Sequence, residues 1–319
     1  MSRHITWITG ARGFIGRHVA RRCAARGDLV AGLGHGAWRD PESRPWGISH
    51  WLNGDITASN LARLAETTGL PDVVLHLAGG SSVGSAIDQP REDFFRTVAT
   101  TVELLDWLRL ASPATVVVAA SSAAVYGAGH EGPIAEDARL TPFSPYGHHK
   151  LMMESLCRSY GDTYGLRAVI ARLFSVYGDG LTKQLLWDAC TQLESGAGSL
   201  SLGGTGRELR DWVHVDDIAA VLAEMDVQAA TTVPVFNVAS GRGTPVSGIA
   251  GALVSAWREA RGGPGIGVTF TGRSRPGDPF SLVADVGALA GIGARCEHEV
   301  TAGIAAYVAW FGRYRSSLA

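Results

Sequence analysis

The chain has 319 residues, of which 46% are hydrophobic and 18% are charged, and its formal net charge is −2 at pH 7. These values describe a globular protein with one large domain or two smaller ones, and they exclude a disordered chain. Because it has no block of like charge and no CxxC pair among its four cysteines, we predict no nucleic-acid binding, no disulfide framework and no zinc site.

The beginning of the chain, MSRHITWITG, runs directly into a strand-like segment, without the basic and apolar regions of a signal peptide. No apolar stretch is long enough to span a membrane. We therefore expect a cytoplasmic protein with no membrane partner.

Strand-like runs alternate with helical patterns through the first 175 residues. The expected strands are, in chain order, HITWIT, DLVAGL, HWLNGDI, DVVLHLAG, ATVVVAAS and RAVIARLF. The expected helices cover GRHVARRCAAR, residues 61–68, about 91–110, and PYGHHK onward to about 164. This alternation predicts an α/β fold with a Rossmann-like, doubly wound parallel sheet, whose ligands bind beyond the carboxyl ends of the strands.

The texture of the sequence changes after about Ser175. Glycine-rich turns such as SGAGSLSLGGTG and RGGPGIG separate shorter elements, so we expect a smaller C-terminal α/β substrate-binding domain. DWVHVDDIAAVLAEM and VPVFNVAS are expected to return to the main sheet. The predicted dinucleotide-binding domain is therefore 1–175 with about 211–242, and the substrate domain is 176–210 with 243–319.

The motif TGARGFIG stands between the first strand and the first helix. Glycines in such a loop allow a tight turn, close approach of a pyrophosphate to backbone N–H groups, and close packing of helix on strand. This position favours a dinucleotide site over an ordinary glycine turn. The candidate cofactor-binding residues of the loop are Gly10, Arg12, Gly13, Phe14, Ile15 and Gly16.

The end of the second strand indicates which dinucleotide binds. LVAGLGHGAWRD has glycines and His35 where an NAD site has a carboxylate for the ribose, and Arg12 and Arg39 are cations close by in the sequence. A missing carboxylate and nearby cations suit a 2′-phosphate, so NADP is favoured over NAD. The alternative is that both arginines are solvated surface residues. Asp55 is a candidate for the adenine edge, together with its neighbour Ile56.

Tyr146 and Lys150 stand four residues apart in SPYGHHK. Residues at this spacing share one face of a helix, so both side chains can point at one site. A free phenol has a pKa of about 10, and a nearby ammonium lowers that pKa by stabilising the phenolate. Tyr146 is therefore a candidate proton acceptor for a hydroxyl that loses a hydride to the cofactor, and Lys150 is also expected to bond the nicotinamide ribose.

The fifth expected strand ends in SSAAVYG, which brings Ser121 and Ser122 to the edge of the sheet where the glycine loop lies. A serine there can donate a hydrogen bond to the reacting oxygen. Three motifs at one edge together predict a site for oxidoreduction.

TGARGFIG, HLAGG, SSAAVYG, PYGHHK and RDWVHVDDIA, in this order, resemble the extended short-chain dehydrogenase/reductase family, and within it the nucleotide-sugar epimerase/dehydratase group. The resemblance covers essentially the whole chain. It implies that Ser122 is the catalytic serine, Tyr146 the acid/base and Lys150 its activator. It also implies a lining of the cofactor site by Leu77, Ala78 and Gly79. The substrate-binding residues that it implies are Ser82, Ser122, Ser175, Arg210 and Arg275, with the two arginines on the sugar-nucleotide diphosphate.

Several positions depart from the pattern of that group. Ala123 and Ala124 stand where dehydratases carry an Asp-Glu pair, and methyl groups can neither abstract a proton nor assist loss of water. Thr97 and Ser175 replace family asparagines, which leaves the bound nucleotide open. His149 replaces a frequent serine. Since His148 and His149 are adjacent, they point to different sides of a helix, and we expect surface or packing histidines and no metal site.

The sequence leaves three hypotheses for function. The first is an NAD(P)-dependent epimerase of a nucleoside-diphosphate sugar that oxidises and re-reduces C4, with a role in polysaccharide biosynthesis. The second is an NADPH-dependent reductase of a nucleotide-linked 4-keto-6-deoxy sugar, and the third is a non-catalytic NADP-sensing module. The intact serine, tyrosine and lysine disfavour the third. The apolar faces of the helices at about 91–110 and 146–164 imply, by resemblance, a homodimer.

Overall fold

The structure, a computed structural model, describes residues 4–262, 265–273 and 279–317. The chain divides into two compact units. The first consists of the residues up to Gly127, Glu136–Leu173 and Ile218–Val238, and the second of Ala128–Ala135, Phe174–Asp217 and the residues from Ala239 onward.

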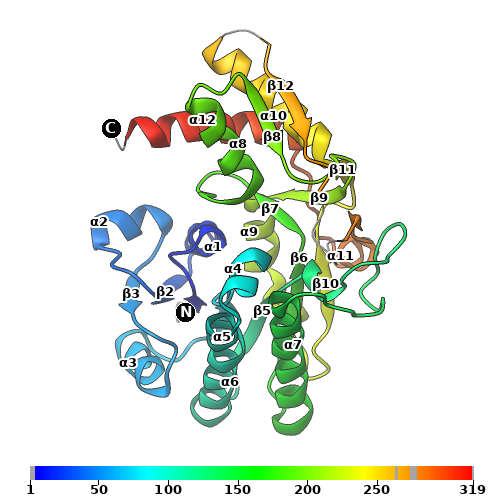
Figure 1. Cartoon of the computed structure of the whole chain (residues 1–319). Coiled ribbons are helices and arrows are strands. Elements are labelled where there is room, and N and C mark those ends of the chain that lie inside the picture. The colour runs from blue at the N-terminus through cyan, green and yellow to red at the C-terminus, as the bar shows by residue number, and fades with distance from the viewer. Residues whose placement is uncertain (1–3, 263–264, 274–278, 318–319) are drawn as a thin grey trace. The chain divides into compact units, whose positions relative to one another are not determined.

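The first unit is built on a seven-stranded sheet in the order β10-β6-β5-β4-β1-β2-β3 (Figure 1). Every neighbouring pair of its strands is parallel. Its strands are β1 (Ile5–Thr9), β2 (Leu29–Gly34), β3 (His50–Asn53), β4 (Val73–His76), β5 (Val116–Ser122), β6 (Ala168–Leu173) and β10 (Val235–Val238). The central strands are buried on both faces, which explains their continuous apolar runs, and the predicted fold class is confirmed.

Helices flank this sheet. Among the described residues they are α1 (Phe14–Arg26), α2 (Asp40–Ser43), α3 (Ala58–Thr68), α4 (Val83–Asp88), α5 (Pro90–Phe94), α6 (Thr100–Ala111), α7 (Pro145–Tyr164) and α9 (Val215–Ala223), with the short turns η1 (Arg44–Trp46), η2 (Phe95–Ala99), η3 (Ala123–Val125) and η4 (Met225–Gln228). The single helix expected over about 91–110 is three pieces, because a π-helical turn, η2, separates α5 from α6. Trp7 of β1 stacks on Trp107 of α6 in the core, with ring centroids 5.6 Å apart.

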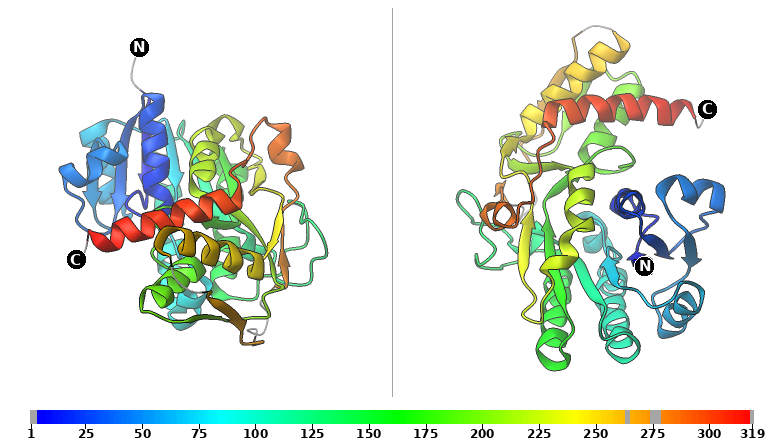
Figure 2. Two further views of the ribbon diagram at one scale, coloured as in Figure 1. Left: turned by 90° about the horizontal axis from the view of Figure 1, so that it is seen from above. Right: turned by 180° about the vertical axis from the view of Figure 1, so that it is seen from behind.

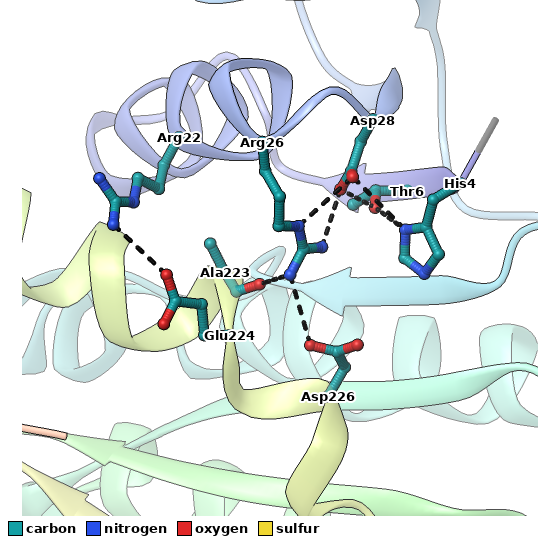
Figure 3. A network of polar contacts seen from close by, with 8 residues as sticks. All are labelled: His4, Thr6, Arg22, Arg26, Asp28, Ala223, Glu224 and Asp226. Carbon is teal, nitrogen blue, oxygen red and sulfur yellow. Dashed lines mark hydrogen bonds and ion pairs between the residues drawn. The ribbon is translucent and has the colours of Figure 1, made fainter. Parts of the chain in front are cut away.

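Arg26, the last residue of α1, ties this helix to the end of α9 and to the turn that follows it (Figure 3). Its Nη2 lies 2.8 Å from the buried carboxylate of Asp28, and its Nη1 donates to the carbonyl oxygen of Ala223. Asp226 lies 3.6 Å from the same guanidinium, and Thr6 of β1 donates to Asp28 at 2.7 Å. Burial raises the pKa of Asp28, but the hydrogen bonds from Arg26 and Thr6 outweigh it and hold this pKa below its usual range. One set of charges therefore joins the first strand, α1 and the returning segment.

The second unit has smaller sheets. β9 (Leu209–His214) pairs with β7 (Ser175–Tyr177), β11 (Gly243–Pro245) and β13 (Ser281–Leu282), and β8 (Ser199–Leu202) pairs with β12 (Gly267–Phe270). Its helices among the described residues are α8 (Gln184–Glu194), α10 (Val246–Arg261), α11 (Gly287–Gly291) and α12 (Val300–Ser316). α12, the red helix, packs along α10 (Figure 2).

The segment DWVHV was expected in the main sheet, and here the prediction is wrong. It forms β9 of the second unit, whereas α9 and β10 carry the chain back to the main sheet. The buried carboxylate of Asp211 explains the difference, since it accepts hydrogen bonds from the N–H and O–H of Ser240 and from the N–H groups of Gly241 and Ala284, at 2.6 to 3.3 Å. β9 is thereby fastened to two distant segments of the second unit.

The helices within the described part of the chain include none whose length and apolar character would let it cross a membrane.

Candidate active site

The glycine motif forms the turn from β1 into α1. Gly10 has a φ of +71°, and a Cβ on it would lie 3.0 Å from the backbone nitrogen of Ala78. A Cβ on Gly16 would collide with the carbonyl oxygen of Gly10. Gly13 caps α1 without a side-chain hydrogen bond, which leaves N–H groups of the first turn available to a pyrophosphate. These glycines fit a dinucleotide diphosphate site, because they allow the tight turn and the close approach of backbones that such a site requires.

The loop after β4 is held against this turn. The N–H of Ala78 donates to Thr9 Oγ1 at 3.2 Å, and the N–H of Gly80 donates to Thr97 Oγ1 at 2.8 Å. A Cβ on Gly79 would lie 3.4 Å from Nζ of Lys150. The predicted lining residues Leu77, Ala78 and Gly79 are therefore placed between the glycine turn and the predicted activator lysine.

His76, at the end of β4, supports this loop from below. Its Nδ1 lies 2.8 Å from Thr9 Oγ1 and its Nε2 lies 3.0 Å from Thr101 Oγ1. Burial, and to a smaller degree the charge of Lys150, lower the pKa of His76 to about 3. His76 is therefore neutral at physiological pH and acts as a hydrogen-bonded brace, a role that the sequence analysis missed.

The structure brings the three predicted catalytic residues together. Ser122 ends β5, Tyr146 is the second residue of α7, and the side chains of the two are hydrogen-bonded. Lys150, one turn later, is buried and donates from Nζ to the carbonyl oxygen of Ala120 at 2.8 Å. The fold thus joins a hydroxyl, a phenol and an ammonium that were predicted from three separate motifs.

The protonation of this trio differs from the sequence-based expectation. Burial raises the pKa of Tyr146, the hydrogen bond with Ser122 opposes this rise, and the charge of Asp93 adds to it. Burial lowers the pKa of Lys150 to about 8, against the opposing effects of Asp93 and Glu154. The expected lowering of the Tyr146 pKa is therefore not produced by the chain alone.

Among the described residues 33–36, which end β2 and follow it, there is no Asp or Glu. His35 follows β2 and its Nε2 lies 3.2 Å from Asp55 Oδ1, with both side chains exposed. The guanidinium of Arg12 packs against Gly36, where a side chain would collide with it. Arg39 is exposed at the beginning of α2. Further candidates were Phe14 and Ile15, which are half-buried in α1, and Ile56, which is buried after β3.

The predicted substrate residues lie in both units. Ser82 of the first unit caps α4 and accepts from the N–H of Ser85 at 3.2 Å. In the second unit, Ser175 begins β7, and Arg210 of β9 donates from Nη1 to the carbonyl oxygens of Leu209 and Phe280. The list of candidates also included Arg275, which falls outside the described residues.

The two adjacent histidines were expected to be surface or packing residues, and the structure has one of each kind: His148 is exposed and His149 packs inside. The side chain of His149 is 11% exposed, and its Nδ1 lies 2.6 Å from Oδ2 of Asp93, which is 6% exposed. The ring of Phe94 packs edge-on against His149. A largely buried acid–imidazole pair therefore adjoins Lys150, the predicted catalytic lysine.

A second buried group that the sequence analysis missed braces β5, β6 and α7. Arg172 of β6 binds both carboxylate oxygens of Glu154 in α7, at 2.9 and 2.8 Å. Ser121 donates to Glu154 at 2.6 Å, Arg172 donates to the hydroxyl of Tyr126 at 2.9 Å, and that hydroxyl donates to Asn237 at 2.6 Å. All five residues are buried. The network fixes Ser121, which precedes Ser122, and Glu154, which lies one helical turn after Lys150.

Among the described residues, the side chains of His214, Asp216 and His298 offer ligand atoms within 4.8 Å of one another. Their geometry does not suit a metal. The two imidazoles stack with centroids 4.5 Å apart and 20° between their planes, so one ion cannot lie in the plane of both rings. Nδ1 of His214 already accepts from the N–H of Asp216, and Nδ1 of His298 lies 2.6 Å from Asp217.

Comparison with known proteins shows the family of the chain. Residues 6–239 match the model of the NAD dependent epimerase/dehydratase family. The chain belongs to this family. The UDP-glucose 4-epimerase of Azospirillum brasilense is a relative that is 33% identical over 302 residues, covering 87% of this chain and 82% of the relative.

Two solved structures resemble nearly the whole chain. The UDP-glucose 4-epimerase of Thermus thermophilus in complex with NAD is 27% identical, with a TM-score of 0.84 over 97% of this chain and 99% of the other. MoeE5 in complex with UDP-glucuronic acid and NAD is also 27% identical, with a TM-score of 0.82 over 97% and 99%. The chain is therefore similar over nearly its whole length to two proteins that were solved in complex with NAD.

Proposed function

We propose that this protein is an NAD(P)-dependent epimerase that inverts C4 of a nucleoside-diphosphate sugar. The observation that carries the proposal is the meeting of Ser122, Tyr146 and Lys150 beside the glycine turn, in a chain whose relatives are named UDP-glucose and UDP-glucuronate 4-epimerases. UDP-glucose and UDP-glucuronic acid are the first substrates to test.

The chain's own residues move the proton. Tyr146, as the phenolate, accepts the proton of the C4 hydroxyl as the C4–H bond breaks, and it returns that proton to the carbonyl oxygen when the bond forms again. Ser122 donates a hydrogen bond to the same oxygen and stabilises its charge. Lys150 contributes the positive charge that favours the phenolate. When bound, the nicotinamide serves as the acceptor and later the donor of the hydride.

Two alternatives are less well supported. Ala123 and Ala124 are buried and apolar, so the chain offers no acid–base pair for dehydration next to Ser122. Reduction of a 4-keto-6-deoxy sugar needs the same catalytic residues. The relatives, however, are named epimerases, so they do not favour a reductase.

The choice between NAD and NADP is a separate proposal. The neighbours named above were solved with NAD, and they do not support a preference for NADP. We propose NADP on the local chemistry alone, because Arg12 lies against Gly36, just after β2, where NAD sites carry a ribose-binding carboxylate, and a guanidinium suits a 2′-phosphate.

We further propose that the first unit binds the dinucleotide and the second binds the nucleotide sugar, with Arg210 and Arg275 on its diphosphate. A homodimer through α6 and α7 is supported by exposed apolar side chains on these helices, including Val102 at 38% and Met152 at 45%. The cytoplasmic location and a role in polysaccharide biosynthesis stay predictions.

Product analysis by NMR tests the activity. The protein is incubated with UDP-glucose or UDP-glucuronic acid and only trace NAD⁺ or NADP⁺. We expect the C4 epimer to accumulate over many turnovers without net consumption of cofactor. Conversion of neither sugar, nor of the matching GDP-, TDP- and CDP-sugars, would reject the proposal.

A further inference from the structure

The buried carboxylate of Asp93 lies between the loop after β4, which is predicted to line the cofactor site, and the first turns of α7, which carry Tyr146 and Lys150. Asp93 belongs to α5, and its side chain is 6% exposed. Its Oδ2 lies 2.6 Å from Nδ1 of His149, the residue before Lys150 in α7. Its Oδ1 lies so close to Gly80, in the loop after β4, that a Cβ on residue 80 would overlap it. Asp93 therefore touches both the cofactor loop and the catalytic turn.

A buried carboxylate needs compensation. A carboxylate removed from water is strongly disfavoured unless it is hydrogen-bonded and faces a positive charge. The imidazole of His149 supplies the hydrogen bond, and the edge of Phe94 packs on that ring and limits its movement. The positive charge is that of Lys150, whose ammonium interacts electrostatically with Asp93. This arrangement is typical of a buried counter-ion, Asp93, that a hydrogen bond to His149 keeps in place, and it differs from a surface ion pair.

We propose that Asp93 is a positioning residue, the counter-charge that keeps Lys150 protonated and aligned with the cofactor loop, and that His149 holds its carboxylate in place. The inference rests on the proposed function only in the roles of Tyr146 and Lys150. In this proposal Asp93 does not contact the substrate.

The charges around Asp93 come from each element packed against α5. Tyr146 and Lys150 of α7 both respond to its charge, and Glu154 acts on Lys150 from the next turn. His76 is neutral and responds to Lys150 from β4. The remaining acidic, basic and histidine side chains of α4, α5, η2 and the first turn of α7 are Asp88, Arg91, Glu92, Arg96 and His148. Of these, Glu92 pairs with Arg96 on the outside of the helix, so Asp93 is the acid of α5 that faces inward.

The charge of Asp93 has a consequence for pH. Burial alone lowers the pKa of Lys150, and Asp93 opposes that effect, which leaves it at about 8. Removal of the carboxylate charge should therefore lower this pKa, so that Lys150 loses its proton closer to neutral pH. Loss of the His149 hydrogen bond should act in the opposite direction, because the unsatisfied carboxylate has more need of the ammonium.

The test is the pH dependence of cofactor binding, followed by the fluorescence of NADH and NADPH between about pH 6 and pH 10. In the wild type we expect affinity to fall on the alkaline side as Lys150 is deprotonated. Asp93→Asn should move the midpoint of this fall down by about one pH unit, and His149→Ala should move it up. Glu92→Gln, which removes a neighbouring acid on the exposed side of the same helix, should leave the midpoint unchanged.

Coincident profiles for Asp93→Asn and Glu92→Gln would overturn the proposal. So would a shift of Asp93→Asn and His149→Ala in the same direction, which is what general damage to the fold would give. If Asp93→Asn does not fold, the upward shift of His149→Ala alone decides, and its absence counts against the proposal. The assay contains no sugar, so a protein that fails to epimerise but shows these shifts would refute the proposed function and leave this inference standing.

Discussion

Tyr146 is the residue on which the proposed proton transfer depends. Tyr146→Phe keeps the ring and removes the hydroxyl that is bonded to Ser122. We expect turnover of UDP-glucose to fall about 100-fold or more, because the substrate proton has no acceptor. NMR rates measure this, with the affinity for NADH as the control for an intact site. Turnover equal to that of the wild type would exclude Tyr146 as the acid/base.

Arg12 decides between the two cofactors in our proposal. Arg12→Ala should weaken NADP binding by about tenfold and leave NAD binding unchanged, because only the 2′-phosphate loses a charged partner. The measurement is the ratio of the two dissociation constants by fluorescence. Arg44→Ala, which removes an exposed arginine paired with Asp40, is the matched control. If both cofactors lose affinity equally, Arg12 does not bind the 2′-phosphate.

At the scale of single residues, some of the site is predictable from the sequence and some is not. Ser122, Tyr146 and Lys150 stand in motifs whose spacing indicates their chemistry. Asp93 and His149 meet across 56 residues of chain, and an acid in one helix and a histidine in another form no pattern. The raised pKa of Tyr146 was likewise unpredictable, since it follows from burial, which only the packed structure reveals.

At the scale of elements, the turn from β1 into α1 depends on close contact between backbones. In Gly16→Ala, the added methyl would collide with the carbonyl oxygen of Gly10 and push α1 away from the turn. We expect cofactor affinity to drop at least about tenfold, together with a lower melting temperature. Gly251→Ala in α10 is the control, because nothing lies within 4 Å of its added Cβ. An unchanged affinity in Gly16→Ala would show that the helix can shift at no cost.

The Arg26–Asp28 pair makes a second element-scale prediction, about acid. The folded protein holds the pKa of Asp28 below its usual range, so the pair contributes stability above about pH 4 and loses it as the pH falls through the lower folded value. In Asp28→Asn that part of the acid dependence should be missing. Urea unfolding between about pH 6 and pH 3 measures the difference. Parallel curves for the two proteins would mean that Asp28 titrates normally.

The limits of the elements were harder to predict than their kinds. The helix of the tyrosine and lysine was expected up to about Tyr164 and ends there, because Gly165 adopts a left-handed conformation. By contrast, the π-helical turn Phe95–Ala99 left no mark in the apolar periodicity. It arises where Thr97 turns inward to accept the N–H of Gly80, a contact between distant segments.

For the whole molecule, the proposed homodimer gives a test of its own. Met152→Glu places a charge on the exposed apolar face of α7 and should convert a dimer into a monomer. Light scattering coupled to gel filtration measures the mass. Val227→Glu, at a side chain that is 78% exposed in η4, should leave the mass unchanged. A wild-type protein that elutes as a monomer would contradict the proposal at once.

The two units also differed in how far the sequence predicted them. Regular alternation of strand and helix indicated the parallel sheet of the first unit. The second unit is held by very short strands, such as Ser281–Leu282, which pair with segments far away in the chain. Runs of two or three residues carry no periodicity. The position of β9 depends on the hydrogen bonds of Asp211 to Gly241 and Ala284, which the sequence does not reveal.

The buried arginine of β6 has a consequence for folding itself. β6 reads AVIARL and is buried along its whole length, so an alternation of polar and apolar residues does not fix its alignment with β5 and β10. Arg172 supplies the missing information, because it lies opposite Ser121 and Asn237 and grips Glu154. A slip by one residue would turn the guanidinium away and strand a buried carboxylate, at a cost of about 3 to 5 kcal/mol. The ion pair therefore destabilises folding intermediates in which β6 is misaligned. Its removal should lower the refolding rate and the yield of correctly folded protein before it affects anything else.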